Sequence, residues 1–175
     1  MATSAIPQFH AGAQPVPAAA DRLTIVVFSG ELDRLMAAFT MASGAAACGV
    51  DVTMFFTFWG AAFLKSKPTG VGKTIIERCF GWMLPGGAGA ARLSRMNLGG
   101  VGRYLMLREM KRKGLPSLDE LMQLAQESGV RFAVCESSMS MIGVRREELT
   151  DSVTFEMCGV AHLWDRAAGG QIFFV

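Results

Sequence analysis

Short, nearly unbroken runs of apolar residues alternate along the chain with longer segments of helical periodicity. Apolar and β-branched residues fill positions 23–28 and 52–58, and a similar run covers 130–134. Runs of this length and continuity are typical of strands that are covered on both faces of a sheet. We therefore expect three buried strands here, with shorter strands at 153–154 and 171–175.

The segments between these runs have helical character. An alanine-rich segment, 32–48, ends at a glycine, which is a common helix stop. Segment 118–128 follows Ser117 and carries Glu120 three residues later, a pattern that predicts a capping box at its start. The other expected helical segments are 103–113, 138–142, 145–149 and 158–168.

The alternation of strands and helices predicts an α/β fold, with helices on both faces of a mostly parallel, doubly wound sheet. Residues 22–175 are expected to form this single domain. Glycines punctuate 66–102 within it, which we interpret as an insertion of loops and short helices. Residues 1–21 contain three prolines and no apolar period, so we expect a flexible tail.

The composition is more apolar than that of an ordinary domain. Hydrophobic residues make up 51% of the chain and charged residues 18%, whereas roughly a quarter charged is usual. The charge-free stretches 35–50, 52–64 and 79–91 are shorter than the ~18 residues that announce a spanning helix. We therefore expect a homo-oligomer that covers the apolar surface. A membrane-seeking hairpin, interrupted by Asp51, stays open as an alternative.

The charge of the chain does not favour nucleic-acid binding. The formal net charge is only +2, which gives no strong global field. The basic residues of 103–113 are interpreted as the solvated face of a helix, and the alternative is a contact for an acidic partner protein or a membrane surface.

Four cysteines occur at irregular spacings and without a C-x-x-C pair, which argues against a disulfide scaffold or a zinc site. No secretory signal is visible at the start of the sequence, so we expect reduced thiols in a cytoplasmic protein. We also expect no metal and no organic cofactor. Gly70, Gly72, Lys73 and Thr74 have the residue types of a phosphate loop but not its spacing.

The candidate chemistry lies where the predicted strands end. Open parallel sheets bind ligands outside the carboxyl ends of their strands, and segments 29–31, 58–60 and 135–138 all follow such ends. Among these segments only the last holds a thiol. Because Cys135 leaves a strand and enters a helix, the helix N-terminus would favour its reactive thiolate form. We predict Cys135 as the catalytic residue; the alternative is a small buried hydrophobe.

Other residues at this edge are candidates for substrate binding. Ser137 and Ser138 could cap the helix or donate a hydrogen bond to a sulfur anion. Met139 is soft and polarizable and could wall a sulfur site, although core packing is the competing interpretation. The predicted substrate-binding residues are Gly30, Glu31, Trp59, Ser137, Ser138 and Met139.

The run FAVCESSMSMIGV at 132–144 resembles the signature of the DsrE/DsrF/DsrH-like family, in particular its larger DsrE-like branch. In that signature a cysteine follows a strand and precedes a Ser-Met pair and a Met/Ile-Gly. Segments 29–33, 52–60, 81–85 and 116–121 resemble the same branch in the same order. The similarity thus extends from about residue 22 to the end of the chain.

The resemblance implies a flavodoxin-like or Rossmann-like three-layer fold, homo-oligomers and a persulfide on Cys135. It also implies sulfur exchange with donor and acceptor proteins, namely rhodanese-type proteins and small Tus-type carriers. The leading hypothesis is therefore a sulfur carrier or sulfurtransferase. The alternative is a non-catalytic, homo-oligomeric binding or adaptor module, possibly at a membrane. A third hypothesis is a redox sensor that uses Cys135 with Cys158.

The other cysteines are assigned mainly to packing. Cys48 and Cys79 lie in apolar helical stretches and are expected in the core. Cys158 departs from the Gly-rich entry to the last helix that the family resemblance implies. With His162 four residues later it would share a helix face, a spacing that suits metal ligands or an assisted thiol. No third ligand lies nearby in sequence, so packing is the favoured interpretation.

Overall fold

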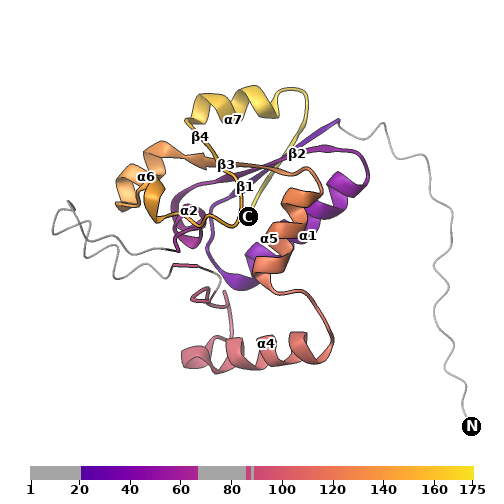
Figure 1. The fold of residues 1–175 in the computed structure, drawn as a ribbon, viewed down its shortest axis with the longest axis vertical. Coiled ribbons are helices and arrows are strands. Elements are labelled where there is room, and N and C mark those ends of the chain that lie inside the picture. The colour runs from indigo at the N-terminus through magenta and orange to yellow at the C-terminus, as the bar shows by residue number, and fades with distance from the viewer. Residues whose placement is uncertain (1–20, 67–85, 88) are drawn as a thin grey trace, which may run out of the picture.

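The computed structural model of the chain describes residues 21–66, 86–87 and 89–175 (Figure 1). Its sheet has five parallel strands in the order β4-β3-β2-β1-β5. The strands are β1 (Arg22–Val27), β2 (Asp51–Phe56), β3 (Arg131–Cys135), β4 (Glu156–Cys158) and β5 (Gln171–Phe174). The α-helices described are α1 (Leu32–Ala47), α2 (Phe58–Phe63), α4 (Val101–Arg112), α5 (Leu118–Glu127), α6 (Glu136–Ile142) and α7 (Val160–Ala167). Two short 3-10 helices, η1 (Leu98–Gly100) and η2 (Arg146–Glu148), complete the described elements.

Helices cover both faces of the sheet. In Figure 1, α1 and α5 lie on one side of the strands and α7 lies on the other. The order of the strands explains this arrangement, since the chain steps from β1 to β4 in one direction and then returns across the sheet to β5. Because parallel crossovers are right-handed, the returning helix is placed on the opposite face. The predicted α/β fold, a flavodoxin-like or Rossmann-like three-layer sandwich with a doubly wound parallel sheet, is confirmed.

The larger part of the core lies between the sheet and the α1–α5 layer. Phe39 of α1 is fully buried, and its ring packs against those of Phe56, Phe63 and Phe132 at centroid distances of 6.1, 6.3 and 6.0 Å. Phe132 belongs to β3, so this aromatic cluster fixes the strand that ends at Cys135.

A smaller cluster lies on the opposite face of the sheet, where Leu163 of α7 packs against it. Its buried members are Val26, Phe55, Ala133, Cys135 and Cys158. Because side chains alternate between the two faces of a strand, Phe132 and Val134 face the main core, whereas Ala133 and Cys135 face α7.

The predicted capping box is present at the start of α5. The Glu120 side chain accepts a hydrogen bond from the Ser117 amide at 2.7 Å, and the Ser117 hydroxyl accepts one from the Glu120 amide at 3.3 Å. These two bonds satisfy amides that the first helical turn leaves without a partner.

Several boundaries differ from the sequence predictions. The strand predicted at 153–154 is wrong, because the fourth strand is Glu156–Cys158. The last helix begins at Val160 rather than at Cys158, since Gly159 is extended at its N-cap. The strand predicted at 52–58 ends at Phe56, and a short helix, α2, begins at Phe58.

Some predictions fall on residues that the structure does not describe. The tail lies there except for Asp21, as does most of the first half of the 66–102 insertion, including Cys79 and the glycine-lysine-threonine run. Within the described residues, no helix has the length and apolar character needed to cross a bilayer. The charge-free stretches 35–50 and 52–64 were the two arms of the alternative membrane-seeking hairpin. The first forms most of α1 and the loop after it, and the second forms most of β2 together with α2.

Candidate functional site

Cys135 is the last residue of β3 and the N-cap of α6. Helix α6 begins at Glu136, two residues earlier than predicted, so the thiol stands directly at the junction of strand and helix. The residue is only 2% exposed. The predicted strand-to-helix position is confirmed, and the sulfur lies in the small apolar cluster under α7.

A buried hydrogen bond joins the first turn of α6 to the residue that follows β2. The hydroxyl oxygens of Thr57 and Ser138 are 2.6 Å apart, and both residues are buried. Ser138 therefore fixes α6 to the start of α2. Thr57 was not predicted as a site residue, because nothing in the sequence indicates its contact with a residue 81 positions away.

The two neighbours of Ser138 have different environments. Ser137 is exposed at the start of α6 and is free to meet a partner molecule, whereas Met139 is 3% exposed and packs in the main core. The environment of Met139 therefore fits the core-packing interpretation better than a sulfur-binding role.

A cavity of about 510 Å³ opens at the carboxyl end of β1. Three of the predicted binding residues, Gly30, Glu31 and Trp59, line it. A side chain at position 30 would not fit, because a Cβ atom there would lie 2.8 Å from the Trp59 carbonyl oxygen. The remaining lining residues are Phe28, Ser29, Arg34, Ala62, Arg92 and Leu93.

The segment that carries Arg92 is held over the start of α1. The Leu32 amide donates to the Arg92 carbonyl at 2.7 Å, and the carboxylate of Asp33 accepts hydrogen bonds from the Ser94 amide, at 2.9 Å, and from its hydroxyl. Partial burial raises the pKa of Asp33, but the bonds from Ser94 outweigh it, and the net pKa is lowered. This stabilisation is present above the usual pKa of aspartate and is lost as the pH falls through the lowered value.

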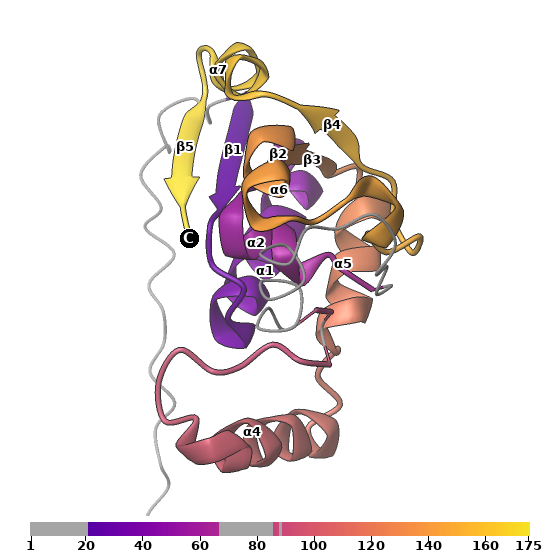
Figure 2. The same cartoon turned by 90° about the vertical axis from the view of Figure 1, so that its left-hand side faces the viewer.

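The predicted residues form two groups at one edge of the sheet. Figure 2 looks toward this edge, with α6 and α2 in front. Helix α2 carries Trp59 and packs against α6, so the two groups are neighbours. The cavity lining nevertheless includes neither Cys135 nor residues 137–139. Arg34 and Arg92, which sequence reasoning missed, add two cations to the cavity beside Glu31.

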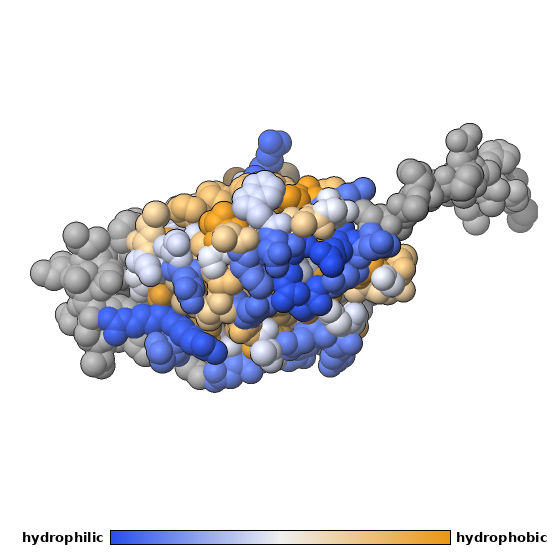
Figure 3. Space-filling view, turned by 90° about the horizontal axis from the view of Figure 1, so that it is seen from above, coloured by the Kyte–Doolittle hydropathy of each residue, from blue (hydrophilic) through white to orange (hydrophobic). Residues whose placement is uncertain are grey.

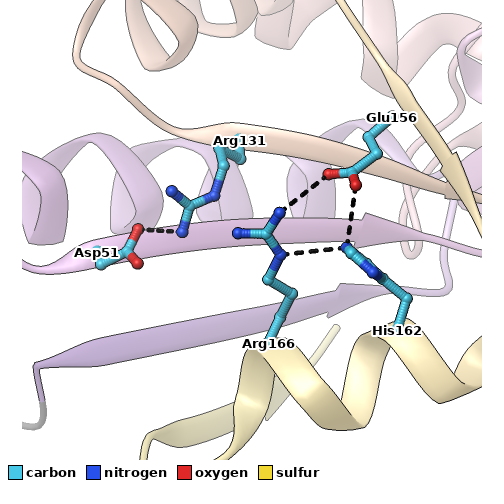
Figure 4. A network of polar contacts seen from close by, with 5 residues as sticks. All are labelled: Asp51, Arg131, Glu156, His162 and Arg166. Carbon is cyan, nitrogen blue, oxygen red and sulfur yellow. Dashed lines mark hydrogen bonds and ion pairs between the residues drawn. The ribbon is translucent and has the colours of Figure 1, made fainter.

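Cys158 is buried in the small apolar cluster, as the favoured packing interpretation expects, and it does not share a helix face with His162. Cys158 ends β4, whereas His162 lies on α7 and its Nε2 is 3.2 Å from Glu156 and 3.1 Å from the Nε atom of Arg166 (Figure 4). Arg166 also contacts Glu156 at 3.4 Å, so these side chains tie α7 to β4. A group of three or more residues able to hold a metal ion was not found among the described residues.

Charged and apolar side chains lie next to each other on the α7 side. Seen from that side, hydrophilic residues gather on the surface with apolar atoms around them (Figure 3). A charged hollow there is lined by Arg22, Asp51, Arg131, His162, Asp165 and Arg166. Two of its three arginines form ion pairs with carboxylates, Arg131 with Asp51 and Arg166 with Glu156.

Cys48 does not lie in the core, contrary to expectation. It is the C-cap residue of α1 and is exposed, six positions after Ala42, the last buried residue of that helix. Cys135 and Cys158, by contrast, are buried.

Most of the chain matches a known protein family. The profile of the DsrE/DsrF/DrsH-like family matches residues 19–174. The chain belongs to this family. It is 40% identical over 156 residues to the uncharacterized protein YrkE of Bacillus subtilis, covering 88% of this chain and 96% of that protein. It is 32% identical over 158 residues to the sulfur carrier protein DsrE2 of Allochromatium vinosum, covering 86% and 95%.

Among solved structures, the YchN protein of E. coli is similar over 88% of this chain and 99% of its own, with a TM-score of 0.49 and 10% identity. The family match of this DsrE-like chain includes both buried cysteines and every residue described at the carboxyl edge.

Proposed function

We propose that this protein is a sulfur carrier that holds sulfane sulfur as a persulfide on Cys135 and passes it between partner proteins. The observation that carries the proposal is the position of Cys135 between β3 and α6, at the edge where parallel α/β sheets bind their ligands. The similarity to a protein named as a sulfur carrier supports the same chemistry.

The transfer needs no cofactor. The Cys135 thiolate attacks the outer sulfur of a donor persulfide, a bond forms between the two sulfurs, and the donor thiolate leaves with the electron pair of the broken bond. The acceptor thiolate then attacks the outer sulfur on Cys135 in the same way. We infer that the donor and acceptor partners are rhodanese-type proteins and small Tus-type carriers, and that the reducing cytoplasm keeps the thiols free.

Access to the sulfur is the main structural demand on this mechanism. Because Cys135 is 2% exposed and faces α7, a donor reaches it only if it is small or if the short helix α7 moves outward. Helix α7 has eight residues, covers the cluster through Leu163 and is tied to β4 by the contacts of its polar side chains with Glu156. Opening of this helix would expose the thiol to a partner while the core under α1 stays intact.

The experiment that tests this function is sulfur loading of the parent protein. After incubation with glutathione persulfide, we expect the intact mass to rise by one sulfur atom per chain, and peptide mapping to place it on Cys135. A small-molecule thiol should remove the sulfur. A parent protein that takes up no sulfur, or takes it up only at Cys48, would contradict the proposal.

A homo-oligomeric binding module is the second candidate, and helix α4 favours it. Figure 2 shows α4 standing apart from the sheet and its covering helices. Of its residues only Met110 is buried, while Val101, Tyr104 and Leu105 are exposed. An isolated helix of 12 residues is marginal in water, so we infer that a second copy of the chain covers this apolar surface.

The basic residues of α4 lie only in part on the solvated helix face that the sequence predicts. Arg108, Lys111 and Arg112 are exposed, as predicted for a solvated face. Arg103 is an exception, because it donates to the carbonyl oxygens of Ala91 at 2.8 Å and Gly89 at 2.7 Å and so holds the preceding loop against the helix.

We expect light scattering to give an oligomeric mass for the parent at micromolar concentration, and a smaller mass for Tyr104→Glu/Leu105→Glu. The double variant places charges in the apolar surface, which disfavours its burial. The matched control is Arg108→Glu, which changes charge on the same helix and should keep the oligomer. A monomeric parent would contradict this prediction.

A further inference from the structure

Cys135 and Cys158 are paired across adjacent parallel strands. The register of β3 and β4 aligns Ala133 with Glu156, Val134 with Met157, and Cys135 with Cys158. Neighbouring strands lie ~4.8 Å apart, and residues aligned in this way project to the same face. Disulfide-bonded cysteines usually have Cα atoms ~4.4–6.8 Å apart, so this spacing permits a bond.

Both thiols share one environment. They are free, they are buried at 2% and 8% exposure, and they belong to the same apolar cluster beneath Leu163 of α7. A sulfur atom held on Cys135 would therefore lie beside a second thiol that the carrier reaction does not use.

We propose that Cys158 resolves the persulfide on Cys135, so that the stored sulfur leaves as hydrogen sulfide and the two cysteines form a disulfide. This second activity, the reductive release of sulfide, rests on the proposed function because it begins from the loaded carrier. The loaded chain can then either pass sulfane sulfur to an acceptor or release it as hydrogen sulfide.

The reaction balances without an external oxidant. The Cys158 thiolate attacks the Sγ atom of Cys135, the bond between that atom and the outer sulfur breaks, and hydrosulfide leaves with the electron pair. The proton lost from the Cys158 thiol balances the charge of the hydrosulfide. In formal oxidation states, the outer sulfur gains one electron and the Cys158 sulfur loses one, while the Cys135 sulfur exchanges one sulfur–sulfur bond for another. A thiol reductant must then restore the dithiol before another cycle.

The surroundings of Cys158 set the rate of this release. Burial, together with the negative charges of Glu156, Cys135 and Glu136, raises the pKa of Cys158 to about 11, and Arg166 of α7 opposes the shift. Only a very small fraction of the Cys158 thiol is then ionised near pH 7. The persulfide is consequently kept at neutral pH, and release rises about tenfold for each pH unit below that pKa.

The test compares the parent with Cys158→Ala, which removes the thiol without placing a hydroxyl group in the apolar cluster. Each protein is loaded with glutathione persulfide near pH 7, freed of donor and moved to about pH 9, where more Cys158 is ionised. Released sulfide and the intact mass without reductant are then measured. We expect the parent to release up to one sulfide per chain and to end two hydrogens lighter than the reduced protein. Cys158→Ala should keep its extra sulfur and release sulfide at least about tenfold more slowly.

The exposed thiol provides a matched control, because Cys48→Ala should release sulfide as the parent does. If the parent loads but keeps its extra sulfur as long as Cys158→Ala does, the release activity is refuted and the carrier function stands. If the parent does not load at Cys135, both proposals fail together. These two outcomes differ at the loading step and so are distinguishable.

Discussion

Replacement of Cys135 by Ser is expected to abolish the specific uptake of sulfur from a sulfane donor. A serine hydroxyl forms no persulfide, and Cys135 is both the last residue of β3 and the N-cap of α6, whereas Gly159 separates Cys158 from α7. The measurement is the intact mass after exposure to glutathione persulfide.

The exposed Cys48 determines how this loading experiment must be controlled. Cys48 stands at the C-terminal end of α1, where the helix dipole disfavours an anion, but a small donor can reach it. Loading should therefore be measured in a Cys48→Ser background, with Cys135→Ser added to it. Equal uptake with and without Cys135 would remove the basis for a carrier function.

The fold of Cys135→Ser must stay intact for this result to be interpreted. The hydroxyl group would be placed among Val26, Phe55 and Ala133, so Cys135→Ala provides a second variant without a polar atom. Both should retain the circular dichroism of the parent.

The central strands were predictable from sequence because their signals are local. A strand buried on both faces has a continuous apolar run, as at 52–58, and a capping box such as that of Ser117 and Glu120 needs only four residues. The position of Cys135 followed from the same kind of signal, a strand that runs directly into polar residues of helical character.

Features that depend on contacts between distant segments could not be predicted. β4 has only three residues, and its identity as a strand depends on pairing with β3 rather than on its own pattern. The alignment of Cys135 with Cys158 follows from that pairing. Arg92 reaches the cavity through the hydrogen bond between its carbonyl and Leu32, which has no local sequence signal.

Single-residue boundaries also changed the chemistry that the sequence implied. Gly159 is extended and separates the strand from the last helix, so Cys158 and His162 lie on different elements. A spacing of four residues brings two side chains together only when both residues lie in the same helix.

Replacement of Phe39 by Ala is expected to destabilise the protein by about 3–5 kcal/mol. Phe39 is fully buried, and its ring joins α1 to β2, to α2 and to β3 through three aromatic neighbours. Removal of the ring loses the hydrophobic transfer energy and leaves a cavity that these rigid neighbours can fill only in part. For a chain of this size the loss corresponds to a melting temperature lower by roughly 10 °C.

Chemical denaturation measures this loss, and Phe174→Ala is the matched control. It removes the same side chain from β5, where Phe174 is 70% exposed, so the expected cost is below about 1 kcal/mol. Equal costs for the two variants would show that the α1 cluster is not the main support of the sheet.

Because Phe132 lies in β3 three residues before Cys135, Phe39→Ala should also loosen the strand that positions the thiol. We therefore expect its sulfur loading to persist at low temperature and to fail at temperatures that the parent tolerates.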